Sequence, residues 1–181
     1  MRKGEMIMIL IIVSPDGKYK DDNTYQTIVN YCTAPYKRAL FYSPNLDRET
    51  AATEMAELAT SKKKAFGTRI RHMILAFSPY EEMIYGRNMP IAALLIAKSA
   101  CAFYQDRYQI ITTVHRDTQH VHAHIVFNCV SYSTGTKYPG DKRDYYLFQK
   151  HLKKVVKGFS PISYDGAFYS TTENIDEDQE I

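Results

Sequence analysis

The chain has 181 residues, of which 45% are hydrophobic and 24% charged, values that are typical of a folded globular protein and exclude global disorder. No apolar run approaches the roughly 20 residues of a membrane-spanning helix, so we expect no membrane insertion. The net charge of +3 is unevenly spread, because five of the 20 acidic residues and none of the 23 basic ones lie at 173–181. A basic body suits a polyanion partner, although it also fits an ordinary solvated surface.

The first part of the chain predicts two strands and two helices. The solid apolar run at 6–13 is expected for a central strand covered on both faces. Potential N-caps open a short helix over about 24–32. A short strand at 39–43 is followed by a helix at 48–64, which is rich in Ala, Glu and Met and ends in three lysines, favourable against the helix dipole.

The remaining elements continue this alternation. The segment 70–78 reads as a buried strand, and the helix at 90–104 is apolar nearly all round. Two strands at 109–115 and 121–130 are separated by only a few residues and therefore predict a tight hairpin. A basic amphipathic helix follows at 144–157.

Together these elements predict an α+β fold with a largely antiparallel central sheet and helices packed on one face. We expect one domain over residues 1–160 and a C-terminal extension over 161–181, whose acidic end is disordered. The three cysteines are scattered and odd in number, which suits a reducing compartment and indicates a cytoplasmic protein.

Four of the six histidines fall within ten residues, at His115, His120, His122 and His124. Because side chains alternate along a strand, the last three share one face, and the apolar residues between and after them share the other. If 116–119 form the turn, His115 pairs with His120 and becomes a diagonal neighbour of His122.

Three neutral imidazoles that converge on one point form a site for a divalent, transition-type cation. We expect His115, His122 and His124 to be its ligands. With histidine ligands on one sheet and no cysteine expected near them, an open catalytic site is favoured over a closed structural zinc site. Asp117 could accept the second ring N–H of a ligand histidine and fix its tautomer. The alternative is a solvated strand face with chance histidines.

This segment resembles the third motif of plasmid-mobilisation relaxases, the HUH-type endonucleases that nick DNA at a transfer origin. The matching residues are His115, Asp117, Thr118, His122, His124 and Asn128. Arg71–Pro79 is similar to the family's second conserved strand, and Gly135–Lys137 and Asp144–Leu147 resemble the segment after the histidine strand. The resemblance covers about residues 5–160.

The resemblance implies a catalytic tyrosine on the first helix, for which Tyr19, Tyr25, Tyr31 and Tyr36 are the candidates. Tyr31 fits best, since an apolar stretch precedes it and a Pro-Tyr-Lys stretch follows; Tyr25 is the alternative. We expect Tyr31 and Asp117 to be the catalytic residues. The implied reaction is attack of the phenol on DNA, which forms a 5′-phosphotyrosyl link and releases a 3′-hydroxyl.

The resemblance further implies magnesium or manganese as the cation, and as partners single-stranded DNA at an origin of transfer, accessory relaxosome proteins and a coupling protein. DNA contacts are expected where basic and aromatic residues interleave. The residues chosen for this role are Arg71, Lys137, Lys142, Arg143 and Tyr145. His72, His120 and Asn128 are candidates to contact and orient the ligand histidines. His72 also fits an ordinary buried core histidine. His120 also fits a fourth ligand, a general base or a loop residue.

Two other functions remain open at this level. A rolling-circle replication initiator or single-strand transposase of the HUH type would share the histidines and the tyrosine but not the flanking strand matches. A non-catalytic remnant would bind DNA or metal without cutting. A Tyr31→Phe variant separates these, because an active relaxase loses covalent attachment to DNA and keeps binding.

Overall fold

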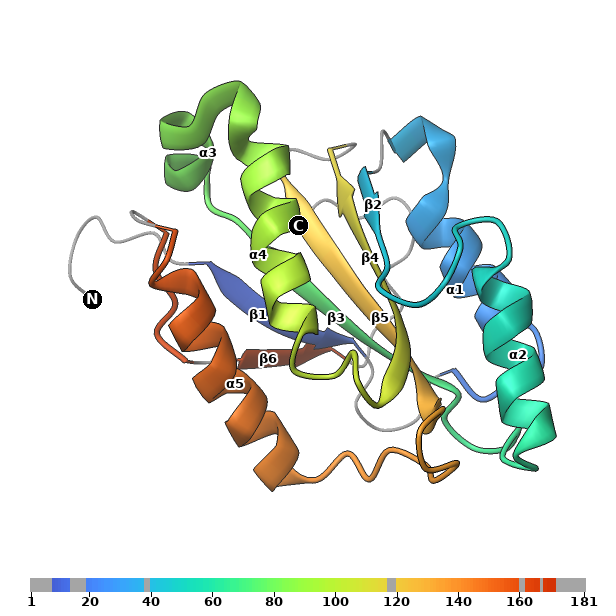
Figure 1. Ribbon diagram of the computed structural model, residues 1–181. Helices are drawn as coiled ribbons and strands as arrows, with labels where there is room; N and C mark the ends of the chain where they lie inside the picture. Colours follow the sequence, from blue (N-terminus) through green and yellow to red (C-terminus); the bar gives the residue numbers. More distant parts are fainter. Residues whose placement is uncertain are drawn as a thin grey trace.

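The computed structural model describes residues 8–13, 19–37, 40–116, 120–159, 162–166 and 168–171. Its centre is a six-stranded sheet in the order β2-β4-β5-β3-β1-β6 (Figure 1). The strands are β1 (Ile9–Val13), β2 (Leu40–Tyr42), β3 (Ile70–Ala76), β4 (Tyr108–His115), β5 (His122–Ser131) and β6 (Phe168–Thr171). All pairings among β1 to β5 are antiparallel and only β6 runs parallel to β1, which confirms the largely antiparallel sheet.

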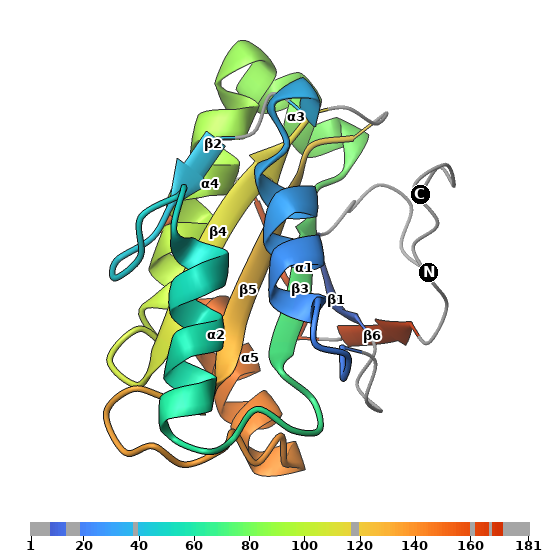
Figure 2. The same ribbon diagram turned by 90° about the vertical axis from the view of Figure 1, so that its right-hand side faces the viewer.

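Helices cover both faces of this sheet, so the prediction of helices on one face is wrong. On one face lie α1 (Thr24–Thr33) and α2 (Ala51–Ser61), and on the other lie α4 (Met89–Cys101) and α5 (Lys142–Val156) (Figure 2). The central strands are apolar toward both sides: Val126 of β5 packs with α1 and α2, whereas Phe127 packs with α4 and α5. Each apolar face of the sheet is therefore buried by its own pair of helices.

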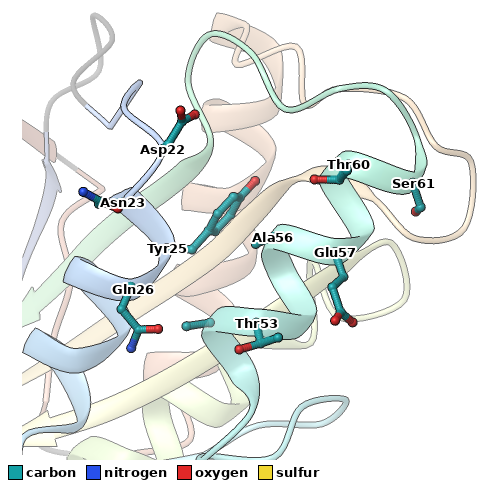
Figure 3. Close-up of a pocket in the computed structure, with 10 residues that line it drawn as sticks. Asp22, Asn23, Tyr25, Gln26, Thr53, Ala56, Glu57, Thr60 and Ser61 are labelled. Atoms are coloured by element: carbon teal, nitrogen blue, oxygen red, sulfur yellow. The ribbon is translucent and has the colours of Figure 1, made fainter.

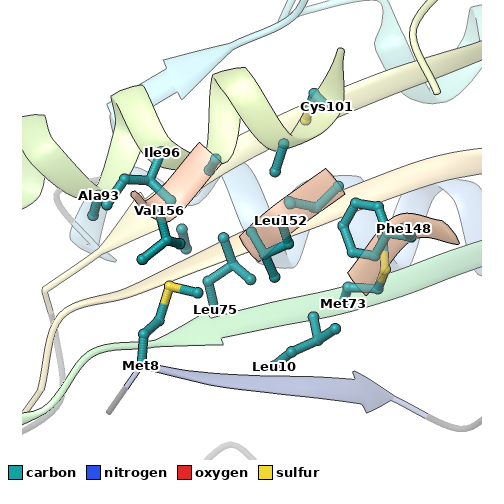
Figure 4. Close-up of a cluster of buried hydrophobic side chains, with 14 of the residues drawn as sticks. Met8, Leu10, Met73, Leu75, Ala93, Ile96, Cys101, Phe148, Leu152 and Val156 are labelled. Carbon is teal, nitrogen blue, oxygen red and sulfur yellow. The ribbon is translucent and has the colours of Figure 1, made fainter. Parts of the chain in front are cut away.

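The larger core lies between the sheet and the α4–α5 pair (Figure 4). Met73 and Leu75 of β3 meet Ile96 of α4 and Phe148 and Leu152 of α5, and each of these side chains is at most 1% exposed. Burial of each such side chain contributes roughly 1.5–3 kcal/mol. This packing holds β3 and β5 in place, and these strands carry His72, His122 and His124 on their opposite face.

Two elements lack a strong signal in the sequence. The helix α3 (Pro79–Tyr85) begins with a capping box, in which Ser78 and Glu81 bond each other's backbone N–H, but it is too short to show a helical period. The strand β6 lies within the expected extension and adds to the sheet beside β1.

The acidic end at 172–181 lies outside the described residues. Among the described residues, no helix is long and apolar enough to cross a membrane.

Candidate active site

Helix α1 brings Tyr31 to the histidine face of the sheet. Its buried residues Tyr25, Val29 and Cys32 follow the i, i+4, i+7 pattern of a helix packed on one side. Tyr31 lies beside this stripe and stays partly exposed. The centroid of its ring is 5.9 Å from that of His115 and 5.7 Å from that of His124.

The β4–β5 hairpin gathers the three predicted ligands. His122 lies directly opposite His115, and His124 follows on the same face. The ring centroid of His115 is 5.3 Å from that of His122 and 4.3 Å from that of His124. One ring nitrogen from each residue lies within 4.8 Å of the other two. The predicted pairing of His115 with His120 is wrong, because the connection continues through residue 121 before β5 begins.

Backbone carbonyl groups fix two of these rings. Nε2 of His115 lies 2.7 Å from the carbonyl oxygen of Cys32, which belongs to the last turn of α1, where carbonyls lack helical partners. Nδ1 of His122 lies 3.1 Å from the carbonyl oxygen of His120. A carbonyl only accepts, so each of these nitrogens carries the proton and the other nitrogen of the ring keeps its lone pair for a cation.

His72 fixes the third ring. It pairs with Val126 across β3 and β5, which places it diagonally from His124 on the same face. Nε2 of His72 lies 2.7 Å from Nδ1 of His124, and Nδ1 of His72 lies 3.1 Å from the hydroxyl of Tyr19. The distances fix the partners, whereas the direction of donation depends on the ring tautomers. The tautomer in which Nδ1 of His124 donates to His72, and His72 donates to Tyr19, leaves the lone pair on Nε2 of His124 for a cation.

His124 is prepared to bind a cation. It is 1% exposed, and its Nε2 has no hydrogen-bond partner among the described residues. Burial, followed by the neighbouring His72 and His115, keeps the pKa of His124 well below its usual 6.5, so the ring is neutral at physiological pH. A neutral imidazole with a buried lone pair that faces two more imidazoles fits a divalent cation.

The sequence indicated no role for Lys37 or Cys32. The turn η1 (Pro35–Lys37) follows α1 and brings Nζ of Lys37 to 4.1 Å from the centroid of the Tyr31 ring, although the lysine is only 5% exposed. The only signal for Lys37 was its place in the Pro-Tyr-Lys stretch that helped to select Tyr31. Cys32 is fully buried, and burial raises the pKa of its thiol to about 12, so it is a neutral thiol.

The alternative tyrosine lies elsewhere. The Tyr25 hydroxyl donates to the side-chain oxygen of Asn128 at 3.2 Å, and the amide of Asn128 donates to the carbonyl of Met55 at 2.9 Å. Both Tyr25 and Asn128 are buried and connect α1 and α2 to the sheet, so Asn128 is not gathered with the ligands. Asp117 and the side chain of Tyr36 lie outside the described residues.

His120 lies against α3 rather than in the ligand cluster. Its Nδ1 is 3.5 Å from the carboxylate of Glu82, and the same carboxylate accepts the backbone N–H of Val121 at 2.7 Å. Neither group of potential ligand atoms found among the described residues includes His120. Its contact with Glu82 instead anchors the residues that lead into β5.

A groove of about 510 Å³ lies between α1 and α2 (Figure 3). Its lining includes Asp22, Tyr25, Glu57 and Thr60, and no Lys or Arg of the described part of the chain lines it. It therefore does not suit a phosphate, and it lies at the Tyr25 end of α1 rather than the Tyr31 end.

The predicted DNA-contact residues do not gather with the histidines. The guanidinium of Arg71 lies 5.4 Å from the ring centroid of Tyr138, which belongs to the core under α5. The Lys137 ammonium donates to two backbone carbonyl groups near residue 67. The first turn of α5 holds Lys142, Arg143 and Tyr145. The role of these five residues stays a prediction.

Residues 31–159 match the family described as "Relaxase: MobA/VirD2-like, nuclease domain". A solved structure described as "Molecular Basis of Vancomycin Resistance Transfer in Staphylococcus aureus" is similar over 91% of this chain and 100% of that one, with a TM-score of 0.57 and 11% identity, which is a likeness of fold alone. No curated protein matches the chain. The family match covers more than half of the chain and includes Tyr31, His115, His122 and His124. The chain therefore belongs to the relaxase family, as a MobA/VirD2-like nuclease domain that nicks DNA for mobilisation.

Proposed function

We propose that this relaxase cuts and rejoins one DNA strand at an origin of transfer through a covalent link to Tyr31, with a divalent cation held by His115, His122 and His124. The observation that carries this proposal is the position of the Tyr31 ring, whose centroid lies within 6 Å of those of two of the three ligands.

The reaction joins the Tyr31 oxygen to phosphorus as the bond from phosphorus to the 3′ oxygen breaks. The phenol proton passes to solvent, the 3′ oxygen takes up a proton, and the 5′ side of the strand remains on the tyrosine. When bound, the cation neutralises charge on the non-bridging oxygens of the phosphate. Because the phosphotyrosyl link conserves the energy of the phosphodiester bond, a 3′-hydroxyl can reverse the step without ATP.

Lys37 supports this step through its charge. Its ammonium lies over the ring of Tyr31 and is almost fully buried, so its field is weakly screened by water. A cation in this place stabilises the negative charge that develops on the phenol oxygen. Lys37 thus places a positive charge beside the nucleophile. The histidine ligands are neutral, so the bound divalent cation keeps its full positive charge for the phosphate.

His72 and Tyr19 hold His124 in the tautomer that binds the cation. Metal-binding histidines commonly donate their second N–H to a carboxylate or a carbonyl, whereas here the proposed acceptor is the imidazole of His72, 2.7 Å away. Asp117 remains our candidate catalytic residue, as an alternative to a backbone carbonyl in accepting the ring N–H of His115 or His122. Three nitrogen ligands favour manganese over magnesium in affinity, because magnesium prefers oxygen.

Single-stranded DNA is the proposed substrate, with accessory relaxosome proteins and a coupling protein as further partners. Arg116 is exposed directly after His115, and its backbone N–H donates to the carbonyl of Lys37. Arg48 donates to the carbonyl of Thr33 at the end of α1. These two arginines lie in or next to the elements that carry the site, and we assign them the nearest phosphate contacts. The basic stretch at the start of α5 is a more remote contact region.

The test is incubation of the protein with labelled single-stranded oligonucleotides from the transfer origin and Mn²⁺, followed by mass mapping of the peptide that stays linked to DNA. The proposal predicts a linked peptide that contains Tyr31, and loss of the link when EDTA is present. A link at another residue would overturn the assignment of Tyr31. DNA binding without any link would favour the non-catalytic remnant.

A further inference from the structure

A second set of potential ligand atoms lies behind the three-histidine site. The thiol of Cys32 and one ring nitrogen each from His72 and His124 lie within 4.8 Å of one another. Their exposed fractions are 0%, 2% and 1%. The three residues come from α1, β3 and β5, so the expectation that no cysteine lies near the histidines is wrong.

The donor atoms of this second set select a different cation. One sulfur and two imidazole nitrogens are the ligands of Zn²⁺ and of the softer Cd²⁺. Magnesium and manganese gain little from sulfur, so they favour the all-nitrogen site that faces Tyr31. The two sites share His124. Nδ1 of His124 lies 2.7 Å from Nε2 of His72 and is therefore the nitrogen that we assign to the second site.

We propose that a thiophilic divalent cation, Zn²⁺ or Cd²⁺, binds to Sγ of Cys32, Nε2 of His72 and Nδ1 of His124, and thereby removes His124 from the three-histidine site. The binding site stands on its own geometry, and only its effect on nicking rests on the proposed function. Such a cation would be an inhibitor of the relaxase that acts without contacting DNA.

Proton positions explain why the two cations exclude each other. In the tautomer that can bind the nicking cation through Nε2, the His124 proton is on Nδ1, in the 2.7 Å hydrogen bond to His72. When Nδ1 binds the thiophilic cation, that proton moves to Nε2, which then has no lone pair for the nicking cation. The Cys32 thiol loses its proton to solvent as the metal–sulfur bond forms.

The required movement is small. Metal–ligand distances of about 2.0–2.3 Å place the ligand atoms of a tetrahedral site roughly 3.2–3.8 Å apart. The two ring nitrogens, now 2.7 Å apart, must therefore separate by roughly 0.5–1.1 Å, and the Cys32 thiol, within 4.8 Å of both, must approach them by at most about 1.5 Å. The hydroxyl of Tyr19 lies 3.1 Å from Nδ1 of His72 and can accept a proton carried there, which leaves the lone pair of that ring on Nε2, toward His124.

The test is a Cd²⁺ titration of the metal-free protein without DNA, followed by the ultraviolet charge-transfer absorbance of a cadmium–thiolate bond. We expect this absorbance to saturate at one Cd²⁺ per chain in the wild type. It should be lost in Cys32→Ser and weakened at least about tenfold in affinity in His72→Ala. Cys129→Ser, which changes another buried cysteine, and His122→Ala, which changes only the three-histidine site, should keep it.

Mn²⁺ calorimetry then tests the exclusion. One equivalent of Cd²⁺ should abolish Mn²⁺ binding by the wild type, and the thiolate absorbance should persist when Mn²⁺ is added. An unchanged thiolate absorbance in Cys32→Ser, or none in the wild type, would overturn the site. Undiminished Mn²⁺ binding with Cd²⁺ bound would overturn the exclusion. Circular dichroism of Cys32→Ser, with Cys32→Ala as a second variant, separates loss of the ligand from loss of the fold. None of these readouts depends on Tyr31 or on nicking.

Discussion

The imidazole of His115 and the backbone carbonyl of Cys32 are joined by a hydrogen bond of 2.7 Å, which connects β4 to the last turn of α1. Cys32 directly follows Tyr31, so this bond fixes the position of a proposed cation ligand relative to the proposed nucleophile. Since the acceptor belongs to the backbone, the bond does not depend on the side chain at position 32. A firm link of this kind is what positioning of a nucleophile requires.

The first prediction concerns the ligands. His122→Ala removes a nitrogen from the three-histidine site, and we expect it to weaken Mn²⁺ binding by roughly 100-fold or more, since loss of a supporting residue alone costs about 10- to 100-fold. His120→Ala is the matched control, because His120 contacts Glu82 instead. Calorimetry with Mn²⁺ measures both. An equal loss of affinity in the two variants would make His120 a ligand and contradict the assignment.

The second prediction concerns His72. His72→Ala removes the acceptor for Nδ1 of His124, so we expect Mn²⁺ affinity to fall by about 10- to 100-fold. His72→Gln, which keeps an acceptor, should restore part of that affinity, whereas a purely space-filling role for His72 gives no such rescue. If both variants bind Mn²⁺ as the wild type does, His72 has no part in orienting the ligand.

The third prediction follows from the buried, neutral His124. Its pKa lies well below 6.5 in the folded protein, while in the unfolded chain it is near 6.5. As the pH falls through about 6.5, the unfolded chain takes up a proton that the folded protein does not, so stability is lost on acidification and is fully present above that range. Urea unfolding of the metal-free protein between about pH 7.5 and 5.5 should show this loss. His124→Asn should reduce the slope, and an unchanged slope would speak against a neutral His124.

The fourth prediction concerns Lys37. Lys37→Met keeps the aliphatic stem and removes the charge over Tyr31, so we expect the nicking rate to fall by roughly 100-fold with a smaller effect on DNA affinity. Lys37→Arg keeps the charge and should retain more activity. Single-turnover nicking with excess protein measures the rate. A rate for Lys37→Met equal to that of the wild type would remove Lys37 from the mechanism.

Local patterns in the sequence predicted which residues of the histidine strand share a face, but not the register of that strand against β4. The alternation of His122 and His124 with Ala123 and Ile125 predicted both faces of β5 correctly, and the structure places the predicted Tyr31 beside these rings. The register failed because it depends on the length of the connection between β4 and β5, which a histidine pattern does not specify.

Contacts between segments that are distant along the chain could not be predicted from local sequence patterns. The bonds from His72 to His124 and from His115 to Cys32 arise only when β3, β4 and α1 come together across 52 and 83 residues of chain. The helices on both faces were in part foreseeable. The unbroken apolar run at 6–13 indicated a strand covered on both sides, which one layer of helices cannot provide.

The central claim is that Tyr31 is the nucleophile, and the most direct measurement is the yield of DNA–protein adduct on a denaturing gel for Tyr31→Phe and Tyr25→Phe with Mn²⁺ and origin DNA. We predict no adduct from Tyr31→Phe, at least about 1,000-fold below the wild type, with DNA binding retained. Tyr25→Phe loses one hydrogen bond to Asn128, worth about 1 kcal/mol of stability, and should still form the adduct. Adduct from Tyr31→Phe at the yield of the wild type, or its loss in a folded Tyr25→Phe variant alone, would contradict the claim.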